Sequence, residues 1–140
     1  MYKMNPNYLL GIEFLDIQHQ KLFELMEKVQ ILLKDQNMLY KYEEIHTILH
    51  GLVDYSNIHF KQEVAYMESI DYPRLELHIE AHKGFQDKLS DIIVKYTNIS
   101  LITQDEIIMD LMEYLTVWLQ NHILDCDRKI ANFINTGEAI

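Results

Sequence analysis

Five histidines and two acidic residues are candidates for a metal site: His19, His59, Glu63, His78, His82, His122 and Asp127. In the strings His59-Phe-Lys-Gln-Glu63 and His78-Ile-Glu-Ala-His82, the outer residues are four positions apart. On a helix, this spacing places two side chains on one face, one turn apart, so they can share a metal ion or bridge two. Imidazole nitrogens and carboxylate oxygens are both ligands of transition metal ions.

The elements that must position these residues are predicted from apolar stripes with the period of a helix. Three predicted helices cover about residues 16–34, 42–68 and 73–96, the last opening at Pro73, a favoured first helical residue. A fourth begins at the possible capping box Thr103-Gln-Asp-Glu106 and continues past His122. Each stripe has at least one histidine on its apolar side, so we expect the histidines to face one common core.

Length and connections define the expected architecture. At 140 residues the chain suits one domain, residues 1–140. The connections at 35–40, 69–72 and 98–102 are short, which favours antiparallel neighbours. We therefore predict an all-α fold, an antiparallel up-down-up-down four-helix bundle over about residues 12–134. An N-terminal arm precedes it, and the residues from Asn135 onward are expected to be frayed or to cap the bundle.

Burial of so many polar groups favours a metal. A lone buried histidine is more often a packed core residue than a ligand, but two carboxylates in a bundle core each cost on the order of several kcal/mol unless they are paired. Two divalent ions would supply the compensating charge. His46 and His50 have the same four-residue spacing, yet they fall beside or opposite the core face of their helix, so we interpret them as surface residues.

Composition limits the possible partners and locations. The formal net charge of −10 argues against nucleic acid and anionic membranes, because binding of phosphates relies on clustered Lys and Arg. Cys126 is the only cysteine, which excludes an intrachain disulfide. The chain has no apolar segment typical of a signal peptide and no apolar run of about 18 residues. We expect a soluble, cytoplasmic protein.

The ordered set of histidines and carboxylates resembles the ligand set of the hemerythrin family, in particular its bacterial single-domain members. The resemblance covers about residues 9–131 and includes flanking strings: Gly11-Ile12-Glu13, Asp16-Ile-Gln-His19, His59-Phe60, Tyr72-Pro73, His82-x-x-Phe85 and Trp118-Leu119-x-x-His122-Ile123. It implies a site for two iron ions (Fe2+/Fe3+) joined by an oxo or hydroxo bridge.

The resemblance also implies a role for each site residue. One iron would be held by His78, His82 and His122, and the other by His19 and His59. Glu63 and Asp127 would bridge the two ions. The iron with two histidines would keep an open position for dioxygen. The implied pocket around that position is apolar and consists of Phe60, Trp118, Leu119 and Ile123.

One spacing does not fit a regular helix. Asp127 lies about 140° from His122 on an ideal helical wheel, whereas Cys126 lies only about 40° away. For Asp127 to reach the site, either the helix widens locally, as in a π-bulge, or the side chain reaches back. We expect Cys126 to be buried in packing, with a metal thiolate as the alternative.

The function that the resemblance implies is reversible dioxygen binding for storage, transport or scavenging, without catalysis. The same centre would also suit a di-iron oxidase, a peroxidase or a nitric-oxide-handling enzyme. An oxygen sensor would need a separate partner protein. Zinc is chemically possible, but five histidines and two carboxylates exceed the four ligands of an ordinary structural zinc site.

Overall fold

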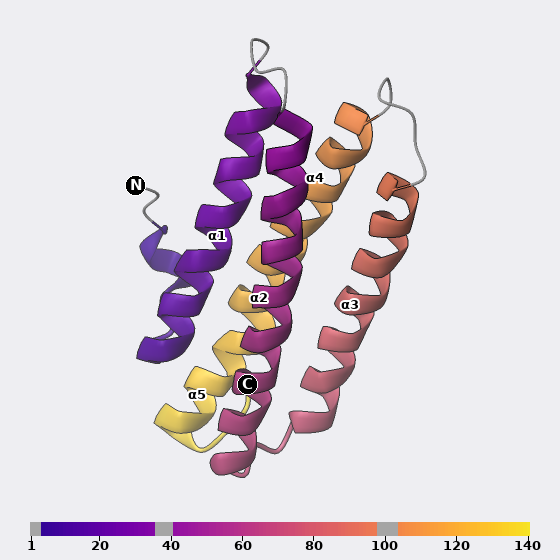
Figure 1. The fold of residues 1–140 in the computed structure, drawn as a ribbon. Coiled ribbons are helices and arrows are strands. Elements are labelled where there is room, and N and C mark those ends of the chain that lie inside the picture. Colours follow the sequence, from indigo (N-terminus) through magenta and orange to yellow (C-terminus); the bar gives the residue numbers. More distant parts are fainter. Residues whose placement is uncertain (1–3, 36–40, 98–103) are drawn as a thin grey trace.

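The computed structural model describes residues 4–35, 41–97 and 104–140. Its long helices are α1 (Glu13–Lys34), α2 (Lys41–Ser69), α3 (Leu75–Thr97) and α4 (Gln104–His122). They lie side by side, and successive helices run in opposite directions (Figure 1). The described residues contain no strand, so the all-α, up-down-up-down bundle predicted from the sequence is confirmed.

The fourth helix continues through an irregular turn. After α4 comes a π-helix, η3 (Ile123–Asp127), followed directly by α5 (Arg128–Thr136). Gly137 ends α5 in the left-handed conformation, with φ of 79°, and its amide donates to the carbonyl of Phe133. The helix thus continues one residue past Asn135, the point from which we expected the chain to be frayed or to cap the bundle.

The N-terminal arm is anchored to the bundle. It contains a short 3-10 helix, η1 (Pro6–Tyr8), before α1 begins. The carboxylate of Asp16 accepts hydrogen bonds from the backbone amides of Leu10, at 2.8 Å, and Gly11, at 3.1 Å. Because Gly11 has φ of 82°, it can turn the chain back over the first helical turn. The helix therefore starts at Glu13, three residues before the predicted start.

The start of α3 also differs from the prediction. Pro73 lies in a turn, and the helix begins two residues later, at Leu75. Asp71 takes a left-handed conformation with φ of 53°, and the Tyr72 amide donates to the carbonyl of Met67. This compact turn ends α2 and delays the entry into α3. The predicted capping residue Thr103 lies outside the described residues.

The core is apolar along the bundle except at one level. Leu15, Ile45, Met67, Ile108 and Leu111 are completely buried. Between the apolar layers lies a group of buried polar side chains: His19, Ser56, His59, Glu63, His78, His82, His122 and Asp127. Among the described residues, no helix is both long and apolar enough to cross a membrane.

Candidate metal centre

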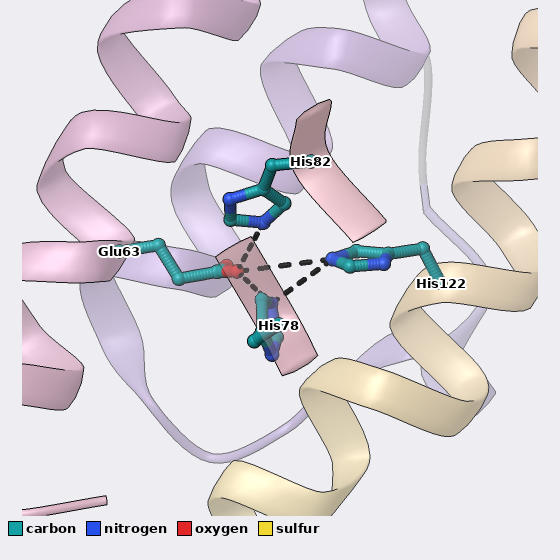
Figure 2. A group of neighbouring side chains, drawn as sticks. All are labelled: Glu63, His78, His82 and His122. Atoms are coloured by element: carbon teal, nitrogen blue, oxygen red, sulfur yellow. Dashed lines mark hydrogen bonds and ion pairs between the residues drawn. The ribbon is translucent and has the colours of Figure 1, made fainter. Parts of the chain in front are cut away.

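Each helix of the bundle contributes to the polar layer. His19 comes from α1, His59 and Glu63 from α2, His78 and His82 from α3, and His122 from the last position of α4. Asp127 is added by η3. The side chains of Glu63, His78, His82 and His122 point toward one another in Figure 2. All seven predicted ligands thus meet in one buried cluster.

Glu63 lies between two sets of histidines. Its Oε1 atom is 2.5 Å from Nε2 of His78, 3.0 Å from Nε2 of His82 and 3.8 Å from Nε2 of His122. Its Oε2 atom instead lies 3.4 Å from Nε2 of His59. The two oxygens of this carboxylate therefore face different groups of nitrogens.

Asp127 repeats the arrangement of Glu63. Its Oδ1 atom is 3.0 Å from Nε2 of His78 and 3.1 Å from Nε2 of His122. Its Oδ2 atom is 3.1 Å from Nε2 of His19. Both carboxylates consequently span the space between a three-histidine side and a two-histidine side.

The described residues contain two groups that could each hold a metal ion. One consists of Glu63, His78, His82 and His122, and the other of His19, His59, Glu63 and Asp127. All side chains in both groups are buried. The groups share Glu63, and together they offer donor atoms for two adjacent ions.

The π-helix explains how Asp127 reaches this cluster. A π-turn takes one more residue than an α-turn, so a residue five positions after His122 returns to the inner face. Asp127 is fully buried, whereas Cys126 is only half-buried. The local widening predicted as one alternative is confirmed. The expectation that Cys126 is buried was wrong, because the widened turn moves it to a surface groove of about 680 Å³ that Trp118 and His122 also line.

The buried polar atoms fit metal ions better than they fit one another. His19 Nδ1 and Nε2, Glu63 Oε2 and both carboxylate oxygens of Asp127 have no hydrogen-bond partner of acceptable geometry. Nε2 of His122 and Nε2 of His78 are 3.1 Å apart, and these two nitrogens face each other directly, with no oxygen between them. Unpartnered buried donors and acceptors are costly. Cations between them would use these lone pairs and neutralise both carboxylates, so the residues fit a metal centre.

The charges of the cluster shift its pKa values. Burial lowers the pKa of His78, but the close carboxylates of Asp127 and Glu63 outweigh it and raise the pKa to about 9. Burial also lowers the pKa of His122, but the charge of Asp127 outweighs burial and raises this pKa well above its ordinary value. Although burial raises the pKa of Asp127, the charge of His122 and the nearby nitrogens of His19 and His78 hold it well below its usual range.

The pKa values of two further histidines, His59 and His82, shift the other way, because burial outweighs their contacts with Glu63. The pKa of His59 is lowered to about 4, because the effect of burial outweighs the opposing charge of Glu63. Burial is also the main reason that the pKa of His82 is lowered. At neutral pH the metal-free cluster therefore holds its compensating protons on His78 and His122, while His59 and His82 are neutral.

Metal loading at pH 7 is expected to release protons. His78 has a pKa of about 9 in the metal-free protein and is protonated at pH 7, but a ligating nitrogen must be deprotonated. The same holds for His122. Adding Co2+ or Fe2+ to the metal-free protein in weakly buffered anaerobic solution should acidify it, as followed with a pH indicator. A His78→Gln variant should release fewer protons, and loading without acidification would contradict the assignment.

Gln18 orients one of the predicted ligands and was missed in the sequence. Nδ1–H of His59 donates to Oε1 of Gln18 at 2.6 Å, and the Gln18 amide donates in turn to Gln62. This bond fixes the proton on Nδ1 and leaves the Nε2 lone pair facing Glu63. The available signal was the place of Gln18 beside His19, which does not itself reveal a partner on another helix.

A Gln18→Leu variant is expected to bind metal more weakly by roughly 10- to 100-fold, because the loss of an outer partner leaves a ligating histidine without its orientation. Competition with a chelator, using Co2+ as the metal, would measure the change. Gln62→Leu is the matched control, since Gln62 contacts Gln18 and not the histidine. Equal affinities for the parent protein and Gln18→Leu would show that the amide has no positioning role.

Aromatic rings cover the three-histidine side. Phe60 stacks on His82, with ring centroids 4.0 Å apart and an interplanar angle of 15°. Trp118 stacks on His122 at 4.3 Å and 13°. Phe60 and Trp118 also meet edge to face at 5.8 Å. These contacts hold the imidazole planes and shield the cluster from water.

A small apolar cavity lies one helical turn from the ligands. It has a volume of about 20 Å³ and is lined by Leu22, Met26, Leu52, Ser56, Phe60, Phe85, Leu115, Trp118 and Leu119. Leu22, Ser56 and Leu119 are each three residues from a cluster histidine on their own helix. The Ser56 hydroxyl donates to the Leu52 carbonyl at 2.7 Å, so the lining presents no unused donor there.

The cavity includes three of the four residues expected around the open position. Phe60, Trp118 and Leu119 line it. Ile123 is fully buried but is not among the lining residues. His46 and His50, interpreted as surface residues, belong to neither metal group, and they are half-buried and exposed respectively.

Comparison with known proteins agrees with this arrangement. The family model described as the hemerythrin HHE cation binding domain matches residues 10–134. A bacteriohemerythrin of Clostridium acetobutylicum is 33% identical over 129 residues, covering 92% of this chain and 98% of that protein. A bacteriohemerythrin of Campylobacter jejuni is 32% identical over 66% of this chain and 74% of that protein. One from Methylococcus capsulatus is 29% identical over 84% of both chains. No solved structure matches.

Proposed function

Because the chain belongs to the hemerythrin family, we propose that it binds two iron ions in this cluster and takes up dioxygen reversibly, for storage, transport or scavenging. The observation that carries the proposal is the uneven division of donors. Glu63 and Asp127 each face three-histidine and two-histidine sides with separate oxygens. A centre with fewer ligands on one side leaves room there for a small ligand.

This geometry supports an assignment of residues to each ion. His78, His82 and His122 would hold one iron, and His19 and His59 the other, with Glu63 and Asp127 between them. An oxo or hydroxo group is the proposed third bridge. When bound, such an iron pair supplies reversible redox chemistry and an open coordination position.

The chain's own residues determine whether such a centre binds or reacts. Leu119, Phe60 and Trp118 line the cavity beside the cluster with apolar atoms. A space of about 20 Å³ is close to what one water molecule needs, but the lining is apolar apart from Ser56, so water there would lack the roughly two to four polar partners that hold a buried water. Exclusion of water and protons favours return of the ligand unchanged over its reduction.

A Leu119→Ala variant is expected to hold dioxygen less reversibly and to convert faster to the ferric state, because the enlarged cavity admits water. The substitution should also lower the free energy of unfolding by about 2–5 kcal/mol. Leu49→Ala is the matched control, since Leu49 is equally buried but lies about 15 Å along α2 from His59. The rate of conversion to the ferric state in air-saturated buffer distinguishes the Leu119→Ala variant from the Leu49→Ala control. Equal rates in both variants would contradict the shielding role.

The proposal is tested against an enzymatic role by following the reduced protein after rapid mixing with dioxygen. Binding predicts a stable spectral change that reverses when the oxygen concentration is lowered, with no net oxygen consumption. Rapid decay of the signal, with continued consumption of oxygen and a reductant, would instead support an oxidase or peroxidase.

A further inference from the structure

A second pair of histidines lies outside the centre, on the other face of α2. His46 and His50 are one helical turn apart, and their Nε2 atoms are 2.9 Å from each other. Their rings are 4.3 Å apart between centroids, at an angle of 73°. His50 is four residues after His46 and nine before His59, so it lies about 14 Å along the helix from the centre. It therefore cannot share an ion with the centre.

The separation of the two nitrogens suits a single metal ion. Imidazole nitrogens bind transition metal ions at about 2.0–2.1 Å, so two of them at right angles around one ion are about 2.9 Å apart. Right-angle ligands are typical of tetragonal Cu2+ and Ni2+ sites. The observed Nε2–Nε2 distance of 2.9 Å matches this arrangement without movement of the backbone.

The surroundings of the pair also favour a cation. Glu43 lies three residues before His46 and Asp54 four residues after His50, which places both carboxylates on the same stripe of α2. Both are exposed. The chain as a whole has a formal net charge of −10, which raises the local concentration of cations. Since His50 is exposed, water can occupy the remaining coordination positions of a bound ion.

We propose that His46 and His50 form a second, surface metal site that binds one divalent transition metal ion, with Cu2+ preferred over Ni2+ and Zn2+. The preference follows from imidazole ligands, right-angle geometry and the general order of divalent affinities. With two protein ligands, the ion exchanges with solution and is distinct from the buried pair. The site does not depend on the function proposed for the buried centre.

The test is equilibrium dialysis of the iron-loaded, air-oxidised protein against cupric ion, with iron measured in the same samples. We expect one copper per chain without loss of iron, and an electron paramagnetic resonance spectrum with nitrogen hyperfine structure. His46→Asn and His50→Asn should each weaken copper binding by about tenfold or more. Because both positions are on the outer face of α2, these variants should keep their helical circular dichroism and iron content.

The control variant is Cys126→Ser, which removes the half-exposed thiol, the other side chain with high affinity for copper. It should bind copper like the parent protein. Unchanged copper affinity in both histidine variants, loss of binding in Cys126→Ser, or absence of nitrogen hyperfine structure would overturn the proposal. An ordinary imidazole–imidazole hydrogen bond would produce no copper stoichiometry at all.

Discussion

A Glu63→Gln variant is expected to retain at most one of the two proposed iron ions per chain. Glu63 is the residue common to both metal groups, with Oε1 facing His78 and His82 and Oε2 facing His59. Glutamine keeps the size of the side chain but replaces one oxygen with an amide nitrogen, which cannot bind a cation. It also removes a negative charge that offsets the charge of the ions. Iron analysis after anaerobic reconstitution and desalting measures the loss.

Glu68→Gln is the matched control for this substitution. Glu68 is also on α2, but its side chain is exposed and belongs to neither metal group. This variant should bind as much iron as the parent protein. A Glu63→Gln protein that is fully loaded with iron would show that the carboxylate does not join the two sides of the cluster.

Removal of the metal is expected to lower the thermal midpoint by roughly 10 °C or more. A ligand that binds only the folded state at about 1,000 times its dissociation constant stabilises it by about 4 kcal/mol, and each kcal/mol shifts the midpoint of a domain of this size by about 3 °C. In the metal-free state, protons on His78 and His122 offset part of the carboxylate charge. Both nitrogens of His19 still have no hydrogen-bond partner.

Thermal unfolding of chelator-treated and Co2+-reconstituted protein, followed by circular dichroism, measures this difference. Hydrogen exchange locates it. The segments around Glu63 and His78 should lose protection when the metal is removed, whereas the part of α2 around Ile45 should change less. An unchanged midpoint after complete metal removal would contradict a metal centre inside the bundle.

Helical periodicity was sufficient to predict the fold and the facing of most ligands. His19, His59 and His78 lie among apolar residues at helical spacing, and burial of an apolar stripe carries its polar members inward with it. The same reasoning placed His46 and His50 away from the core, and neither belongs to the buried cluster. Helical periodicity could not show that the Nε2 atoms of His46 and His50 lie close together, because this distance depends on the side-chain rotamers.

The position of Asp127 could not be predicted from a helical wheel, because the wheel assumes a fixed angle per residue. A π-turn is not visible in the pattern of apolar residues, since it depends on the backbone adopting a wider hydrogen-bonding pattern over Ile123–Asp127. The position of Cys126 was wrong for the same reason, because the widened turn exchanges the inner position between two neighbouring residues. The family resemblance identified the carboxylate, but only the backbone explains how it reaches the site.

Specific side-chain hydrogen bonds account for the other differences. The start of α1 depends on Asp16 accepting the amides of Leu10 and Gly11, which shortens the arm relative to the prediction. The contact of Gln18 with His59 joins two helices through side chains 41 positions apart. Neither pairing leaves a periodic signal, because each depends on the packed geometry of the bundle.

The absorption spectrum of the reduced protein, recorded with its iron content through one cycle of oxygenation and deoxygenation, tests the central claim most directly. The arrangement of Glu63 and Asp127 between two sets of histidines predicts two iron ions per chain. It also predicts a charge-transfer band that appears with dioxygen and disappears when dioxygen is removed. A colourless protein that rejects added ferrous ion, or a band that never reverses, would contradict it.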